Sequence, residues 1–494
     1  MKQFLNEMIL NRKQVLGFGI LTGLFVLLNL VTISWAPLPW LDEIMFADTA
    51  VNFALDGRWT TTAWWNFSHE TPVSLYPPLY QYLLAGWLKI WGFSILSARS
   101  FNIVVAAIVS VVIFSGLRKF NCLKNRYAIL IFVFLFWGTG LFSWSYRNGR
   151  PDMVNLLFSS LFIYNYCLYM KSNRNKWWML INAVLILLSG LQACFFITFF
   201  LLYMYAVKKE YRYKTKIAFL MTVLGFTAGL TALWGHFVYH EHPGSFFWQF
   251  SQSETLSTLL QKIPFLSQSI QPPKTMESIS EGGGMLRCYT LNKNYLFLTC
   301  VNVIVLCFLL IKKKYSKRSA EIDVLGFSLL MPGIMSLSGH CLSPYSWMFY
   351  FPAVIFSVIC MEKYNHKWIW CIYGILTVGF SVISGLPKTL ATADRTAHER
   401  IGKFVEKQKF DKDVVMLSSF STYYPIRKIT RNSYYSVYPV RYLPSNIEYV
   451  LKDETDKHSG KYENFDQYIL EHGRKLIPVD SLMLPKIILY KISD

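Results

Sequence analysis

Ionisable residues that could take part in chemistry gather in two short segments beside long apolar runs of the sequence. An Asp-Glu pair follows the first run directly, and a tight link at 145–152 joins two later runs. A carboxylate there could accept a proton or orient a hydroxyl, and an arginine could hold an anionic oxygen. The candidate catalytic residues are Asp42, Glu43 and Asp152, and the candidate substrate-binding residues beside them are Arg147 and Arg150.

The same residues have structural interpretations that the sequence leaves open. Asp42 falls at the start of a predicted helix, where it could simply cap the helix and interact with its dipole. Arg150 and Asp152 could pair with each other and with lipid headgroups, although ionisable groups at a membrane edge tend to be functional or paired. Arg99, at the outer start of an apolar run, could contact a substrate or act as a snorkelling anchor.

Further candidates for substrate contact lie in two turns. Tyr76 and Tyr80 enclose a Pro-Pro-Leu sequence, which predicts an extended turn before an interfacial helix at 81–91. His340 and Tyr345 lie in a turn before another apolar run, where a donor group or a hydroxyl could meet a phosphate.

Metal and disulfide chemistry have little support in the sequence. His236, His240 and His242 are close together with Glu241, but they do not specify a third ligand, and the nine cysteines are scattered without metal-ligand spacing. We therefore predict no metal site and no required cofactor, and dependence on a divalent metal stays undecided.

The elements that must position these residues are membrane helices. The chain has 494 residues, of which 53% are hydrophobic and 16% charged, whereas soluble domains carry about 25% charged residues. A soluble enzyme and a disordered protein are thereby excluded. Runs of roughly 20 apolar residues predict eleven spans once the long run at 177–207 is split at Ser189-Gly190. The other spans are predicted near 15–36, 97–117, 127–146, 151–170, 217–238, 294–311, 321–338, 345–361 and 368–386.

The charge distribution indicates topology and argues against a nucleic-acid partner. The formal charge is +20, from 49 Lys+Arg against 29 Asp+Glu, and the basic residues cluster in short links between apolar runs. This is the pattern of cytoplasmic loops. The first apolar run is longer than a signal-peptide core, so we expect a retained signal anchor with a cytoplasmic N-terminus. The protein is then a multi-pass plasma-membrane protein, in the inner membrane if bacterial, and its C-terminus lies outside.

The segments assigned to the outside are different in kind. The first external loop, 37–95, is acidic and contains a predicted helix at 44–55 on the membrane surface, with Gly57 as its end. A second external loop covers 239–293. Residues 387–494 have the composition of a small soluble α/β domain, with a helix at 396–409 and strands at 414–417, 447–451 and 486–491, whereas residues 1–386 form the membrane domain.

The order of these motifs resembles the GT-C superfamily of membrane glycosyltransferases, in particular the lipid A aminoarabinose transferase and protein O-mannosyltransferase group. The resemblance is strongest over residues 35–160 and is carried by Leu41-Asp42-Glu43, Gly57-Arg58-Trp59, Pro77-Pro78-Leu79-Tyr80, Ala98-Arg99 and Arg150-Pro151-Asp152, followed later by Ser343-Pro344-Tyr345. Tyr76 stands where the aminoarabinose enzyme has a lysine. The resemblance implies a GT-C fold with external juxtamembrane helices.

The resemblance also implies an activity, inverting transfer of a sugar from a polyprenyl phosphate to an acceptor outside the cytoplasm. Asp42 matches the acid that activates or orients the acceptor, Asp152 matches the second-loop acid, and Tyr345 matches a tyrosine near the donor phosphate. Such a reaction needs a carboxylate near the anomeric carbon and cations on the leaving phosphate, for which Arg99, Arg150 and His340 are candidates. Sugar and acceptor are not specified.

Three other functions stay open at this point. The protein could be a surface-glycan polymerase or ligase that uses a lipid-pyrophosphate donor, which the identity of the consumed lipid would reveal. It could be a transporter of lipid-linked sugars, although polar residues at mid-span are scarce. It could also be a non-catalytic partner that binds lipid-linked sugar, which a turnover assay would separate from an enzyme.

Overall fold

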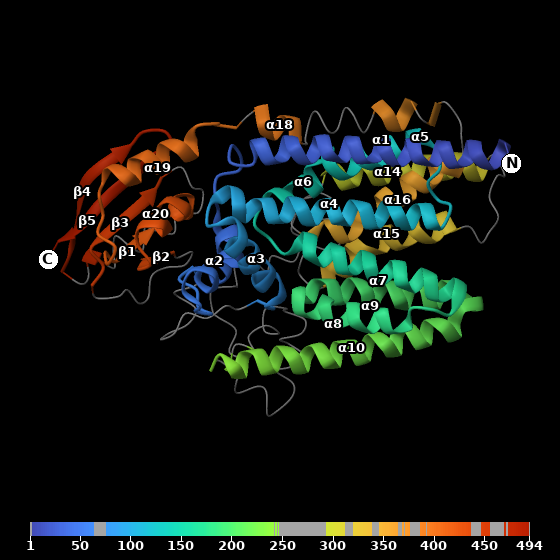
Figure 1. Cartoon of the computed structure of the whole chain (residues 1–494), viewed down its shortest axis with the longest axis horizontal. Coiled ribbons are helices and arrows are strands. Elements are labelled where there is room, and N and C mark those ends of the chain that lie inside the picture. Colours follow the sequence, from blue (N-terminus) through green and yellow to red (C-terminus); the bar gives the residue numbers. More distant parts are fainter. Residues whose placement is uncertain are drawn as a thin grey trace.

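The computed structural model describes residues 2–63, 76–241, 243–244, 246, 293–311, 320–337, 345–363, 368–369, 371–375, 386–391, 393–435, 446–454, 469–470 and 473–493. The molecule is elongated, with a helical bundle at one end and a small sheet domain at the other, and two short helices, α2 and α3, lie between them (Figure 1). The helices up to the sheet domain are α1 (Lys2–Thr32), α2 (Leu41–Asp56), α3 (Leu79–Trp91), α4 (Ile95–Lys119), α5 (Arg126–Val133), α6 (Gly140–Arg147), α7 (Asp152–Ser172), α8 (Lys176–Ser189), α9 (Leu191–Val207), α10 (Arg212–Tyr239), α14 (Lys293–Ile311), α15 (Ala320–Leu337), α16 (Trp347–Lys363) and α18 (Leu386–Ala391).

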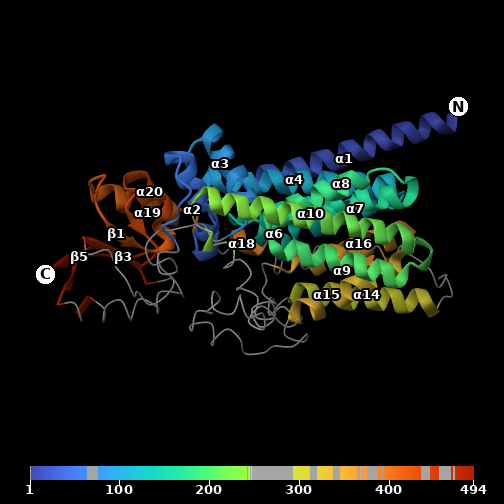
Figure 2. The same ribbon diagram turned by 90° about the horizontal axis from the view of Figure 1, so that it is seen from below.

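The bundle consists of helices that run roughly along the long axis of the molecule, as two perpendicular views show (Figure 1, Figure 2). Among the described residues, four segments are long and apolar enough to cross a membrane, namely Arg12–Thr32, Ile95–Lys119, Asp152–Ser172 and Lys209–Tyr239. Shorter apolar helices accompany them. The chain is a membrane protein, while the number of eleven spans remains a prediction because residues 376–385 lie outside the described part.

The predicted break at Ser189-Gly190 is confirmed. Helix α8 ends at Ser189 and α9 begins at Leu191, so the long apolar run folds back as two short helices. Close packing explains why glycine stands at the turn, since a Cβ on Gly190 would lie 2.6 Å from Nδ2 of Asn155 in α7. A larger residue there would force the Asn155 side chain to move.

The predicted span at 127–146 is interrupted. After α5 the backbone forms a π-helical turn, η1 (Phe134–Gly138), and Thr139 is extended before α6 begins. Side-chain hydroxyls replace part of the interrupted helical bonding, because Thr139 donates to the Leu135 carbonyl at 2.8 Å and Tyr146 donates to the Trp137 carbonyl at 2.5 Å. The interruption matters because α6 leads directly into the link that carries Arg147 and Arg150.

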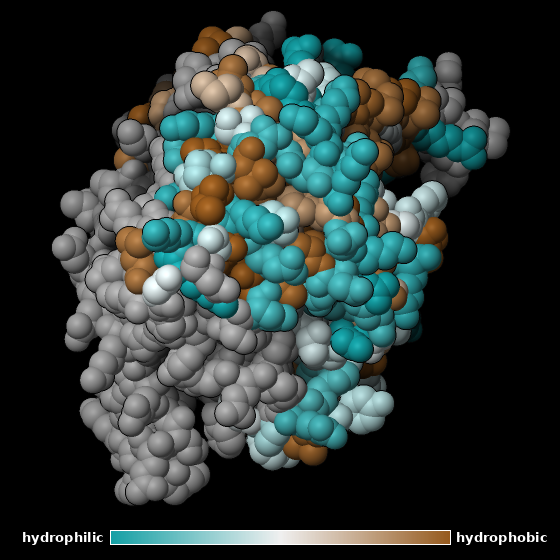
Figure 3. Space-filling model, turned by 90° about the vertical axis from the view of Figure 1, so that its left-hand side faces the viewer, coloured by the Kyte–Doolittle hydropathy of each residue, from teal (hydrophilic) through white to brown (hydrophobic). Residues whose placement is uncertain are grey.

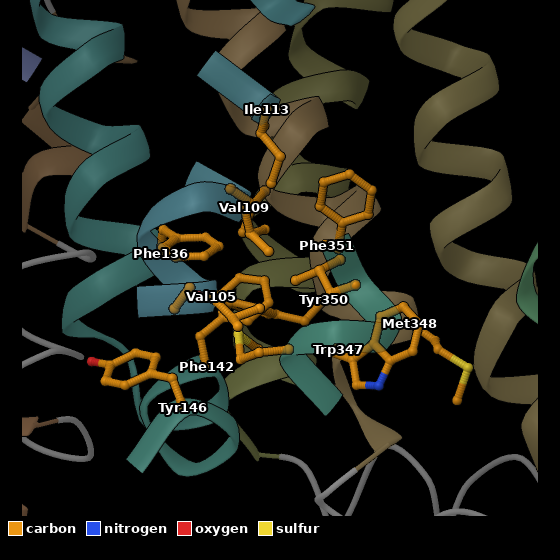
Figure 4. Packing of buried hydrophobic residues seen from close by; sticks show 14 of the residues in the cluster. Val105, Val109, Ile113, Phe136, Phe142, Tyr146, Trp347, Met348, Tyr350 and Phe351 are labelled. Carbon is orange, nitrogen blue, oxygen red and sulfur yellow. The ribbon is translucent and has the colours of Figure 1, made fainter. Parts of the chain in front are cut away.

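Aromatic packing holds α6 against its neighbours. Phe142 of α6 lies with its ring centroid 4.8 Å from that of Phe136 and 5.0 Å from that of Tyr350 in α16. Figure 4 shows these rings gathered around Val105 and Val109 of α4. These side chains are buried, so the core fixes the position of α6, the helix that leads into the link before Asp152.

The C-terminal domain, residues 397–493, is a mixed five-stranded sheet with two helices. The sheet order is β2-β1-β3-β5-β4, with β1 parallel to β2 and β3, and β5 antiparallel to β3 and β4. The elements are α19 (Ala397–Lys407), β1 (Met416–Ser418), α20 (Tyr423–Ile429), β2 (Ser433–Tyr434), β3 (Tyr449–Asp453), β4 (Lys475–Leu482) and β5 (Ile487–Ser493). The predicted helix and three strands are therefore confirmed, whereas α20, β2 and β4 were not predicted.

The domain has a core of its own and a polar outer end. Ile401, Phe404 and Val405 of α19 pack with Met416 and Leu489 of the sheet. Among the described residues, the face of the molecule that it forms carries mostly hydrophilic side chains with scattered apolar ones (Figure 3). Leu38, in the loop after α1, packs against the same core and ties the domain to the bundle.

Helix α2 differs from the predicted surface helix. Its end at Gly57, which has a left-handed φ of 71°, is as expected. The helix is not open to a membrane surface, however, because every residue from Glu43 to Asn52 is buried. The C-terminal domain covers it, and this contact brings residues more than 370 positions apart in sequence into hydrogen-bonding distance.

Candidate functional site

Three predicted residues meet where the bundle adjoins α2 and α3. Nη1 of Arg150 contacts Oδ2 of Asp42, and Nε of Arg150 lies 2.8 Å from Oδ2 of Asp152. Arg150 and Asp152 each have side chains only 2% exposed, whereas the Asp42 side chain is 31% exposed. We call Asp42, Arg150 and Asp152 the Arg150 triad. The triad contains two carboxylates and one guanidinium, and Asp42 is its solvent-accessible member.

Aromatic rings enclose the guanidinium of Arg150. The ring of Phe46 lies 5.0 Å from the guanidinium carbon and the ring of Tyr345 lies 5.8 Å from it, both within cation–π range. Burial alone would lower the pKa of Arg150, but Asp152 and Asp42 raise it above its ordinary value. The guanidinium is therefore permanently charged and is aimed at carboxylate oxygens.

The backbone of the link is held by Asn102 of α4. Nδ2 of Asn102 donates to the carbonyl of Asn148 at 2.6 Å and to that of Arg150 at 3.0 Å. The link also passes very close to α2, since a Cβ on Gly149 would lie 3.0 Å from Cγ of Glu43. Glycine is thus the residue that lets the link approach the acidic helix.

Glu43 and Arg99 form a second, closed site. Nε and Nη2 of Arg99 donate to the two carboxylate oxygens of Glu43 at 2.8 and 2.6 Å, and both side chains are fully buried. The remaining nitrogen of Arg99 donates to the Ile33 carbonyl at 2.8 Å. Tyr424 of the C-terminal domain donates to Glu43 at 3.1 Å. All of these polar groups are occupied by protein partners.

Arg147 is held at the end of α1. Its guanidinium donates to Asn29 Oδ1 at 2.7 Å and to the carbonyls of Thr32 and Ala36 at 2.7 and 3.0 Å. Carbonyls at a helix C-terminus carry partial negative charge, which stabilises the cation. The side chain is 2% exposed, so its contacts point into the protein rather than toward a cleft.

The three tyrosine candidates differ in how they contact the residues of the triad. Tyr76 packs on Phe46, with ring centroids 4.2 Å apart, and Tyr345 lies over Arg150. Tyr80 is buried in α3 with its hydroxyl 3.5 Å from Nδ2 of Asn102, so it supports the link from behind. His340 lies outside the described residues.

The histidines considered for a metal lie elsewhere. Nδ1 of His236 and Nε2 of His240 are 3.2 and 3.3 Å from the hydroxyl of Tyr82 in α3, and the ring of Trp59 lies against both histidines. His242 lies outside the described residues. This cluster connects α10 to the external helices and is separate from the Arg150 triad.

The residues through which the C-terminal domain contacts α2 were not predicted from the sequence. Tyr423 donates to Asp48 Oδ1 at 2.6 Å, and Arg427 contacts Asn52 and lies 3.8 Å from Asp56. The acidic character of the first external loop was visible in the sequence. The Tyr-Tyr pair in the C-terminal domain gave no indication of its partners, because the contact is set by tertiary structure alone.

A separate apolar cavity lies deeper in the bundle. It has a volume of about 300 Å³ and lies between α4, α7, α9, α15 and α16. It reaches Gly116 of α4, which is about 25 Å along the helix from Arg99 at 1.5 Å per residue. An ion pair between Lys208 and Asp323, 2.5 Å long, stands at its edge. The cavity can hold an apolar group but is remote from the triad.

Chemically, the Arg150 triad combines an accessible carboxylate with a fixed cation. The carboxylate could accept a proton from a hydroxyl or hold that hydroxyl in line, and the cation could stabilise negative charge that develops nearby. The closed pair offers neither, since its groups are sealed from solvent.

One segment of the sequence matches a known family model. Residues 76–234 match the family described as dolichyl-phosphate-mannose-protein mannosyltransferase. That segment includes Arg99, Arg150 and Asp152 but not Asp42. No curated protein matches the sequence.

Several solved structures are similar to this one. The oligosaccharyltransferase of Archaeoglobus fulgidus in the apo form has a TM-score of 0.56 at 10% identity, covering 89% of this chain and 69% of that one. AglB from the same organism, in complex with an inhibitory peptide and a dolichol-phosphate, has a TM-score of 0.54 at 10% identity over 89% and 69%. ArnT from Cupriavidus metallidurans in the apo state has a TM-score of 0.45 at 11% identity over 97% and 98%.

The resemblance drawn from the sequence motifs is thereby confirmed at the level of fold. Residues 76–234 match the model of the dolichyl-phosphate-mannose-protein mannosyltransferase family, and the chain shares its fold with the oligosaccharyltransferase of Archaeoglobus fulgidus.

Proposed function

We propose that the protein is a glycosyltransferase that moves a sugar from a polyprenyl-phosphate donor to an acceptor outside the cytoplasm, by inverting displacement. The observation that carries the proposal is the Arg150 triad, in which one partly exposed carboxylate, Asp42, lies against a buried cation. The family domain at 76–234 and the fold support the reaction class. The dolichol-phosphate named with AglB supports a lipid-phosphate donor.

Asp42 is the residue that we assign to the acceptor. In transfer from a lipid phosphate, positive charge develops at the anomeric carbon while the acceptor hydroxyl loses its proton. Asp42 would take that proton or hold the hydroxyl in line with the carbon–oxygen bond that breaks. Its 31% exposed side chain leaves room for an acceptor, in contrast to the other carboxylates near it.

Arg150 is the residue that we assign to the departing phosphate. Asp152 anchors its Nε, so the guanidinium can exchange its contact with Asp42 for a phosphate oxygen without losing its position. Tyr345 and Tyr76 would form the adjoining aromatic wall, and His340 keeps its predicted role at the phosphate. We assign Glu43, Arg99, Arg147 and Tyr80 to holding these groups in place.

Purified protein in nanodiscs, incubated with a panel of polyprenyl-phosphate sugars, tests the proposal. Mass spectrometry should detect free polyprenyl phosphate with the wild type and a loss of about 10²–10⁴-fold with Asp42→Asn, the range for a positioned acid–base group. Asp411→Asn, an exposed aspartate in the C-terminal domain, is the matched control and should retain full turnover.

The outcomes separate the alternatives. Normal turnover by Asp42→Asn would remove Asp42 from the reaction. Release of a polyprenyl pyrophosphate from pyrophosphate-linked donors, with none from phosphate-linked ones, would replace the proposed donor class. Absence of product from every donor, with donor binding retained, would indicate a non-catalytic partner or a transporter.

A further inference from the structure

The C-terminal domain reaches the catalytic region through two neighbouring tyrosines. Tyr423 and Tyr424 begin α20, both are buried, and the hydroxyl of each donates to a carboxylate of α2. Tyr423 bonds Asp48 at 2.6 Å, whereas Tyr424 bonds Glu43 at 3.1 Å. Both contacts are tyrosine–carboxylate hydrogen bonds. They differ in which other residues adjoin the carboxylate.

Glu43 adjoins the Arg150 triad. Glu43 follows Asp42 in the chain, and its Cγ lies so close to Gly149 that a Cβ there would be 3.0 Å away. Gly149 in turn precedes Arg150. Any shift of the Glu43 side chain therefore acts directly on the backbone that carries Arg150 and on the helix turn that carries Asp42.

Asp48 contacts the loop that follows α2 and a residue of α2 itself. Its described partners besides Tyr423 are the hydroxyl of Thr61 at 2.8 Å, the backbone N–H and hydroxyl of Thr62 at 2.6 and 3.4 Å, and Nδ2 of Asn52 at 3.4 Å. This carboxylate retains three groups of partners when the tyrosine is removed. It has no described contact with the link at 147–151.

We propose that Tyr424 is a positioning residue for the Arg150 triad, acting through Glu43, so that the docked C-terminal domain is part of the catalytic apparatus rather than an appendage. The inference rests on the function proposed above. The tyrosine fixes one oxygen of Glu43, the bidentate bond of Arg99 fixes the carboxylate plane, and Glu43 then sets the distance between α2 and the link.

The ring of Tyr424 is held independently of its hydroxyl. It stacks on Phe93, in the turn before α4, with ring centroids 5.7 Å apart. Burial and the neighbouring Glu43 raise the pKa of Tyr424 well above its ordinary value, so the hydroxyl remains a donor. Tyr424→Phe therefore removes one hydrogen bond and leaves the docking surface in place.

The experiment compares Tyr424→Phe with Tyr423→Phe in the full-length protein in nanodiscs. Tyr424→Phe should lower kcat about tenfold, the effect of losing one hydrogen bond to a charged group, while KM for the donor changes by less than about twofold. Tyr423→Phe loses the equivalent bond to Asp48 and should keep kcat within about twofold of the wild type. Similar thermal midpoints for both variants would establish that the domain stays docked.

Hydrogen exchange provides a measurement that needs no turnover. Exchange of peptides that cover 146–152 should rise in Tyr424→Phe and stay at the wild-type level in Tyr423→Phe. If the wild type transferred no sugar, the proposed function would fail and this comparison would still decide the positioning role. Equal effects of the two substitutions, or no effect of Tyr424→Phe on exchange in the link, would overturn the inference.

Discussion

The two arginine–carboxylate sites at the start of α2 use the same residue types in opposite ways. Arg99 and Glu43 form a bidentate pair in which both side chains are fully buried. Arg150 is almost as deeply buried, but it divides its contacts between Asp152 and the partly exposed Asp42. The first site is closed by Tyr424 of the C-terminal domain, whereas the second keeps one carboxylate accessible.

This difference shows how adjacent acids acquire different roles. Successive residues of a helix are rotated by about 100°, so Asp42 and Glu43 cannot face the same surroundings. Glu43 turns into the contact with the C-terminal domain and becomes structural. Asp42 turns toward the Arg150 link and remains available for chemistry.

Breaking the closed pair should produce the largest change in stability. Glu43→Leu alone leaves the Arg99 guanidinium buried without its carboxylate, and we expect a loss of about 3–5 kcal/mol in the free energy of unfolding. The double variant Glu43→Leu with Arg99→Leu removes both charges and should recover most of that loss. Thermal unfolding in detergent measures all three proteins.

The open site supplies the contrast for this prediction. Asp42→Asn should change the free energy of unfolding by less than about 1 kcal/mol, because its carboxylate is partly solvated. If Glu43→Leu were as stable as Asp42→Asn, the distinction between a closed and an open site would be wrong.

Lowering the pH should reduce the free energy of unfolding through protonation of His398 in α19. Burial, with Arg99 and Lys428 nearby, lowers the pKa of His398 to about 4, below its ordinary value of 6.5. The unfolded chain therefore binds the extra proton between these values, so this contribution is complete above about pH 6.5 and is lost as the pH falls toward 4. The loss reaches up to about 3 kcal/mol at 1.36 kcal/mol per pKa unit.

Thermal unfolding from about pH 7.5 to about pH 4 checks the assignment to His398. His398→Gln cannot take up the proton and should show a flatter stability profile than the wild type over this range. Identical profiles for the two proteins would place the acid sensitivity in other groups.

Local sequence patterns predicted most of the fold. Apolar run length located α4, α7 and α10, and Gly190 divided α8 from α9 as expected. The break within 127–146 was missed, because a π-helical turn leaves the apolar composition unchanged. Strand β2 was missed because it has only two residues, and β4 was missed because Pro478 lies inside it and most of its residues are exposed, although it pairs with the next strand, β5.

For the site, the sequence predicted which residues lie together but not which partner each of them contacts. Asp42, Arg150 and Asp152 were expected together and lie together. Arg99 was predicted to contact the phosphate and Arg147 the substrate, and in the structure they contact Glu43 and the end of α1. Partner choice of this kind depends on helix rotation and on the docking of α20, which a linear pattern does not contain.

A substitution at Gly149 sharpens the comparison at the point where the two sites touch. Gly149→Ala places a Cβ 3.0 Å from Cγ of Glu43, so the link must move slightly from α2. We expect a cost of about 1–3 kcal/mol in unfolding free energy and a fall in transfer of up to about 10²-fold, because a small displacement misaligns Arg150 with Asp42. Gly86→Ala in α3, whose new Cβ would meet nothing within 4 Å, is the control and should leave both quantities near the wild-type values. Equal activity of the two alanine variants would mean that the closed pair and the Arg150 triad are not mechanically coupled through Gly149.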